Sequence, residues 1–99
     1  MSNDLSAVNA ALDPRRKRLL YRANHRGMRE LDMLIGQFAE SRVATLSDAE
    51  ADEFERLLDV QDPDMLAWVT GVQPVPAEVN TPFFREMVAF QTQLSPNKL

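Results

Sequence analysis

The residues able to do chemistry near neutral pH are few in this chain, and His25 is its single histidine. No cysteine is present, which excludes a thiolate nucleophile, thiolate zinc ligands and disulfides. One imidazole cannot form a pair of histidines on a metal, and no glycine-rich phosphate loop occurs. Acting alone, His25 is a weak candidate for a proton carrier and is better interpreted as an exposed polar residue at a helix end. The sequence therefore predicts no catalytic residue and no metal ligand.

Two charged runs are the next candidates for chemistry. The acidic run from Asp48 to Glu55 lacks the glycine-centred loop of calcium sites, and we interpret it as a solvated helix face. The segment from Pro14 to Arg29 carries seven bases and no acid, although the chain has a net charge of −4. Residues 1–42 have a net charge of +3 and residues 43–99 of −7. A basic run of this kind indicates nucleic acid, an acidic protein partner, or pairing with the acidic half of the same chain.

The segment around Gly27 is a candidate docking surface. Arg26 and Glu30 are four residues apart, and Met33 and Gln37 continue the same helical line. This line points away from the apolar stripe of the segment, so we expect it to face water. Without a side chain, Gly27 would let a partner surface approach the backbone closely. Alternatively, Gly27 is only a turn residue and Arg26–Glu30 only an intrahelical ion pair worth under ~0.5 kcal/mol; physical arguments alone do not separate the two.

The elements that must position these residues are predicted to be helices throughout. Cap signals precede four helices, whose expected starts are Asp13-Pro14, Ser47 with Glu50, Asp62-Pro63 and Thr81-Pro82. A fifth helix after Gly27 is indicated by apolar residues at helical spacing, namely Met28, Leu31, Leu34, Ile35 and Phe38. Gly36 interrupts this helix, which either allows a close approach of a neighbouring backbone or is simply tolerated.

These signals predict an all-α fold, a small antiparallel five-helix bundle in a single domain over residues 14–94. Residues 1–13 and 95–99 are expected to be flexible tails. No apolar run approaches the ~20 residues that span a bilayer. The first thirteen residues carry two acids and no base, unlike a secretory or mitochondrial leader. We therefore expect a protein of the bacterial cytoplasm.

Beyond these physical signals, the sequence resembles a known family, in two blocks. The first block is RKRLLY at residues 16–21 followed by RGMRELD at residues 26–32, which contains the R-G-x-x-E motif as Arg26, Gly27 and Glu30. The second block comprises residues 57–58, residues 62–64 and Trp68. Together they resemble the succinate dehydrogenase assembly factors that promote covalent attachment of FAD.

The resemblance implies a five-helix bundle that binds the flavoprotein subunit of succinate dehydrogenase, with that of fumarate reductase as a second candidate. FAD would belong to the partner, with none bound stably here, and the chain would not be an enzyme. The partner-binding residues that it implies are Arg26, Gly27, Met28, Arg29, Glu30 and Asp32. Two other classes stay open: a small nucleic-acid-binding regulator using the basic Arg15–Arg29 patch, and an interaction protein of the toxin–antitoxin type.

Overall fold

The computed structural model describes residues 12–94, and the side chains of residues 12–90. This part of the chain contains five α-helices and a 3₁₀ turn and has no strand, which confirms the all-α class. The elements are α2 (Pro14–Asn24), α3 (Arg29–Arg42), η1 (Val43–Thr45), α4 (Asp48–Leu58), α5 (Asp62–Val69) and α6 (Pro82–Leu94).

The expected tails lie outside the described residues except for Leu12 and Asp13. Leu12 is 8% exposed and belongs to the core. The carboxylate of Asp13 caps α2. The folded part therefore includes two residues that the sequence assigned to the flexible N-terminal tail.

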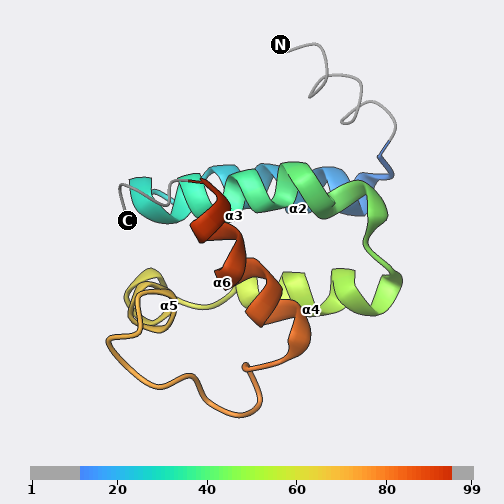
Figure 1. Ribbon diagram of the computed structural model, residues 1–99. Coiled ribbons are helices and arrows are strands. Elements are labelled where there is room, and N and C mark those ends of the chain that lie inside the picture. Colours follow the sequence, from blue (N-terminus) through green and yellow to red (C-terminus); the bar gives the residue numbers. More distant parts are fainter. Residues whose placement is uncertain (1–11, 95–99) are drawn as a thin grey trace.

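The first three helices lie side by side with alternating directions. Figure 1 shows α2 and α3 together as one layer, with α4 below them and α6 crossing obliquely. Helix α2 packs against both α3 and α4, and α6 packs against α3. Helix α5 lies at the end of the molecule where the α2–α3 turn is also found (Figure 1). This arrangement places the Gly27 segment and the start of α5 at one end of the fold.

Most of the predicted cap signals are found at helix starts. The carboxylate of Asp13 accepts the amide of the third residue after it at 2.8 Å. Ser47 and Glu50 each accept the other's backbone N–H, at 3.1 and 3.0 Å, which is the expected capping box. The hydroxyl of Thr81 accepts an amide of the first turn of α6 at 3.1 Å. Local side-chain chemistry therefore sets these three boundaries.

The predicted cap at Asp62 is wrong. Helix α5 includes Asp62, its N-cap is Gln61, and no side chain caps it. The Asp62 carboxylate instead accepts a hydrogen bond from Arg26. The Asp62 side chain therefore makes a long-range contact with Arg26 and, contrary to the local sequence pattern, does not cap its own helix.

Aromatic rings form the centre of the core. Phe38 of α3 meets Phe54, Phe83 and Phe90 edge to face, with ring centroids 6.0, 5.5 and 5.8 Å away. Trp68, which belongs to the second block of the resemblance, is only partly buried and packs against the buried core. No polar or charged residue is fully buried in the part of the chain that the structure describes. Burial of apolar side chains therefore provides the main stabilisation of the helix packing.

Helices α2 and α3 approach closely at Gly36. A methyl group at this position would overlap the side chain of Asn24 at the end of α2. The nearest backbone atom of α2, the carbonyl oxygen of Ala23, would lie 3.5 Å from that methyl group, which is an ordinary contact. A larger residue would therefore meet a side chain of α2 and not a closely packed backbone, which was one of the two expectations from the sequence.

Candidate partner-docking site

The turn between α2 and α3 consists of residues 25–28. Helix α2 ends at Asn24, Gly27 has φ = +97°, and Met28 precedes the first residue of α3. A positive φ of this size is unfavourable for residues with a side chain, so Gly27 is a turn residue. Because α3 begins only at Arg29, Arg26 and Glu30 do not share a continuous helix. The predicted line from Arg26 to Glu30 therefore does not exist.

Arg26 points into the protein, and its side chain is only 7% exposed. Its Nε donates to Asp62 Oδ1 at 2.9 Å. Its Nη1 and Nη2 donate to the carbonyl oxygens of Leu58 at 2.9 Å and Val60 at 2.5 Å. The expectation that Arg26 faces water was wrong, because the guanidinium joins the turn to the segment between α4 and α5.

Two other residues of the predicted docking set are also engaged within the chain. Asp32 Oδ1 accepts the backbone N–H of Arg26 at 2.8 Å. Met28 is partly buried and packs against the core. Both side chains therefore stabilise the turn through contacts within the chain, and this holds with or without a bound partner.

The outward face of the turn is formed by Gly27, Arg29 and Glu30. Arg29 and Glu30 are exposed, and neither has an ion-pair partner among residues 12–90. No atom lies within 4 Å of where a Cβ of Gly27 would be. An incoming surface can thus reach two unpaired charges of opposite sign beside bare backbone.

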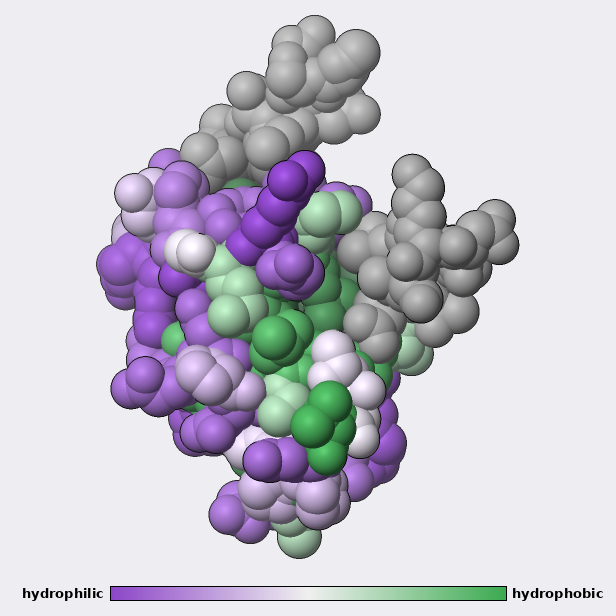
Figure 2. Space-filling model, turned by 90° about the vertical axis from the view of Figure 1, so that its left-hand side faces the viewer, coloured by the Kyte–Doolittle hydropathy of each residue, from purple (hydrophilic) through white to green (hydrophobic). Residues whose placement is uncertain are grey.

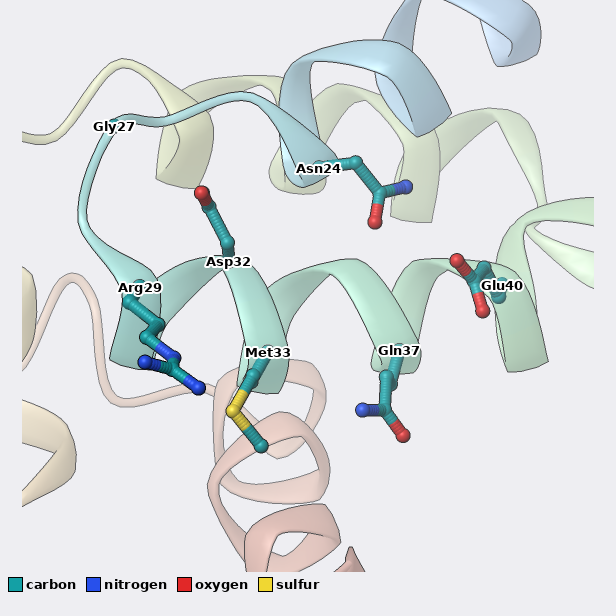
Figure 3. A pocket seen from close by; sticks show the side chains of 7 residues that line it. All are labelled: Asn24, Gly27, Arg29, Asp32, Met33, Gln37 and Glu40. Atoms are coloured by element: carbon teal, nitrogen blue, oxygen red, sulfur yellow. The ribbon is translucent and has the colours of Figure 1, made fainter.

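An open hollow runs along α3 from this turn. Figure 3 shows Arg29, Met33 and Gln37 along one side of α3, with the Asp32 side chain directed up toward the turn. Met33 is 48% exposed and Gln37 is exposed, as expected from the sequence. The water-facing line of α3 is therefore confirmed, but it begins at Arg29 and not at Arg26. Figure 2 shows that the end of the molecule holding this turn also carries a band of apolar side chains bordered by hydrophilic ones.

On the other side of Arg26, Tyr21 and His25 form a stacked pair that we did not predict. Their ring centroids are 4.0 Å apart at an interplanar angle of 17°. Tyr21 is 64% exposed, and His25 is exposed at the end of α2, as expected. The signal that could have revealed the pair is the spacing of four residues on a helix.

The basic run of α2 is largely paired with acids of the same chain, mainly on α4. The pairs are Arg15 with Asp52 and Glu55, Arg16 with Asp13 and Asp48, and Arg22 with Asp59. Of the three possibilities that the basic run left open, the structure therefore shows pairing with the acidic half of the same chain. Only Lys17 and Arg18 of the run before Arg22 are exposed without an ion pair to any described residue. A phosphate backbone would have to compete with the existing pairs, which weakens the nucleic-acid alternative.

The ion pairs and the helix caps lower the pKa of several carboxyl groups. The hydrogen bond from Arg15 lowers the pKa of Asp52. The backbone N–H of Ser47 lowers the pKa of Glu50, and that of Arg16 lowers the pKa of Asp13. Among the described residues, no group of three or more histidine or acidic side chains could hold a metal ion.

Comparison with known proteins provides a further line of evidence. Residues 17–91 match the family model described as flavinator of succinate dehydrogenase. The chain is 42% identical over 90 residues to an FAD assembly factor, SdhE, of Acetobacter pasteurianus, covering 88% of this chain and 83% of that protein. It is 33% identical over 81 residues to the mitochondrial succinate dehydrogenase assembly factor 2 of Dictyostelium discoideum, covering 82% and 55%.

A third relative is the mitochondrial succinate dehydrogenase assembly factor 2 of Mycosarcoma maydis. It is 47% identical over 60 residues, which are 61% of this chain and 25% of that protein. The chain thus spans most of the bacterial relative but from a quarter to about half of these two mitochondrial ones. No solved structure matches.

Proposed function

Because the chain belongs to the family of succinate dehydrogenase flavinators, we propose that it is an assembly factor for the flavoprotein subunit of succinate dehydrogenase. It binds that subunit and promotes the covalent attachment of FAD to it. The observation that carries this proposal is the match over residues 17–91, which contains the whole docking turn. The flavoprotein subunit of fumarate reductase is a second candidate partner.

The proposed action is binding, without catalysis by the chain's own side chains. The histidine that bonds to the flavin, and the flavin itself, belong to the partner. A bound helper can favour the partner conformation in which these two groups are aligned, and alignment alone is worth several kcal/mol. It achieves this only through a higher affinity for the aligned state than for the others. A small rigid bundle with an exposed turn fits this role.

Glu30 is the residue on which the proposed contact depends most. Its carboxylate is exposed and has no ion-pair partner among the described residues, so it is available to a cation of the partner. Removing one member of a charge pair that is buried on binding costs about 2–5 kcal/mol, because the other charge is left unpaired. A pair that stays in water is worth under ~1 kcal/mol. The loss measured for Glu30→Ala therefore reports whether this carboxylate is buried by the partner.

The proposal also covers the cofactor and the compartment. The sequence contains no nucleotide-binding motif, so FAD is held by the partner and not stably by this chain. No helix among residues 12–94 is long and apolar enough to cross a membrane. We place the protein in the bacterial cytoplasm, where the flavoprotein subunit can be met before it joins its complex.

The test is the covalent flavin content of the flavoprotein subunit in a strain that lacks this chain. Only covalently bound flavin survives denaturation, so flavin fluorescence in denaturing gels reads it directly. We expect a strong loss of the band in the deletion strain and its return with the wild-type chain.

A matched pair of variants then tests the site. Glu30→Ala should restore less of the band, whereas Glu78→Ala, which removes an exposed acid from the loop between α5 and α6, should restore all of it. Normal covalent flavin in the deletion strain, with no second helper in that cell, would refute the proposed function. Full rescue by Glu30→Ala would refute only the role of Glu30.

A further inference from the structure

We propose that Asp62 is a positioning residue for the docking turn, although it lies 35 residues further along the chain than Gly27. Asp62 acts through Arg26: it holds the guanidinium, and the guanidinium holds the backbone from which the turn projects. The inference rests on the proposed function, because the turn is taken as the surface that meets the flavoprotein subunit. It assigns Arg26, the first residue of the motif, to the inside of the fold and not to the partner.

The first step is the set of acceptors around the Arg26 guanidinium. All three of its nitrogens donate to oxygens of this chain, and its side chain is 7% exposed. Two of these acceptors are the carbonyls of Leu58 and Val60, and the third is the carboxylate of Asp62. A guanidinium in this position has little capacity left for a partner. Arg26 therefore affects binding through what it holds.

The second step is what the guanidinium holds. The backbone N–H of Arg26 donates to Asp32 at 2.8 Å, so this residue is fixed at its main chain as well as at its side chain. Gly27 follows directly, at φ = +97°, with no atom within 4 Å of its Cβ position. A glycine without packing has the largest conformational freedom of any residue. The hydrogen bonds of Arg26, one from its main chain and three from its guanidinium, therefore hold the turn on the N-terminal side of Gly27 before a partner arrives. Restriction before binding raises affinity.

The third step is the role of Asp62 within its own helix. An aspartate at the start of a helix usually caps it, yet α5 has no side-chain cap. The Asp62 carboxylate is used by Arg26 instead, at 2.8 Å to Nη2 and 2.9 Å to Nε. Among the described residues it is also the one charged acceptor of the Arg26 guanidinium, whose other two acceptors are backbone carbonyls. The α4–α5 segment is therefore part of the docking site without forming its surface.

A double-mutant cycle on the full chain tests the inference. The affinity for the purified flavoprotein subunit is measured by calorimetry for wild type, Arg26→Ala, Asp62→Ala and the double variant. We expect each single variant to have about tenfold lower affinity than wild type. The affinity of the double variant should be no lower than that of the weaker-binding single variant. Asp64→Ala, which removes an exposed acid two residues further along α5, should bind like wild type. Wild-type affinity in Asp62→Ala, or additive losses in the double variant, would overturn the inference.

Exchange of the backbone amide of residue 26, which donates to Asp32 in the wild type, separates positioning from a general loss of stability. Exchange should accelerate in Arg26→Ala and Asp62→Ala, but not in Ser47→Ala, which weakens the fold at the start of α4 through its capping box. Unchanged exchange in Asp62→Ala would overturn the inference whatever the affinity. If wild type itself does not bind the flavoprotein subunit, the proposed function fails, and the exchange measurement still decides whether Asp62 holds the turn.

Discussion

Substitution of Gly27 separates the two properties of the docking turn, its backbone conformation and its accessibility. At φ = +97° any residue with a side chain is strained, so Gly27→Ala should destabilise the fold by about 1–2 kcal/mol. For a domain of this size that loss lowers the Tm by roughly 4–16 °C. The Cβ position is open, with no atom within 4 Å, so a longer side chain meets nothing in the free protein. Gly27→Arg should therefore be as unstable as Gly27→Ala, within ~0.5 kcal/mol.

Partner binding should distinguish the two variants where stability does not. If the flavoprotein subunit closes over the turn, the arginine side chain occupies the space that the partner needs, whereas a methyl group obstructs it far less. We expect Gly27→Arg to bind at least about tenfold more weakly than Gly27→Ala, a difference of ~1.4 kcal/mol. Thermal unfolding and calorimetric titration of both variants, at a temperature where both are folded, provide the two numbers. Equal affinities would refute close approach at Gly27, and unchanged stability in Gly27→Ala would refute the strain argument.

Three further predictions concern the fold. Phe38→Ala should cost about 3–5 kcal/mol in urea unfolding, because this ring is 1% exposed and meets three others; a loss under ~1.5 kcal/mol would contradict the core assignment. Truncation through residue 13 should lower the Tm more than truncation through residue 11, since Leu12 is buried and Asp13 caps α2; identical melting curves would argue against both roles. The pKa values of Asp52 and Glu50 are lower in the folded chain than their ordinary values of 3.8 and 4.5, so both carboxylates stabilise the fold at a pH above those ordinary values. This stabilisation is lost as the pH falls through the lower pKa values of the folded state. Urea midpoints should therefore be level from pH 6 to 5 and fall below about pH 4.5, and a rise toward pH 3 would contradict the sign.

Local signals in the sequence were sufficient to predict the helices. Proline after a capping residue, the Ser47–Glu50 box and apolar residues at helical spacing each depend on neighbours within a few residues. They therefore remained valid in the folded chain at Asp13, Ser47 and Thr81. The segregation of bases and acids into the two halves was compatible with the pairing of α2 with α4, but also with a nucleic-acid or an acidic protein partner.

The direction of Arg26 was not predictable in the same way. Two of its acceptors are main-chain carbonyls more than 30 residues away in the sequence. Every residue has such a carbonyl, so the residue types at these positions do not indicate the contact. The spacing of Arg26 and Glu30 indicated a shared helix face, but the turn at Gly27 interrupts the helix between them. From the sequence, Asp62 could either cap a helix or accept a long-range hydrogen bond. Only the packing of α5 near the turn decides between these two roles. The long-range contacts of the site were therefore not predicted. Its exposed residues Gly27, Arg29 and Glu30 belong to the partner-binding set that the resemblance implies.

The ion pairs between α2 and α4 also have a consequence for how the chain folds. Arg15 and Arg22 each meet an acid 37 residues further along, so during synthesis α2 is complete long before its counter-charges exist. Once α4 has formed, opposite charges draw α2 and α4 together although α3 lies between them in the sequence, which accelerates their encounter. Salt screens exposed charges beyond about 8–10 Å and so acts on the encounter more than on contacts already made. Rising ionic strength should therefore slow folding more than it speeds unfolding.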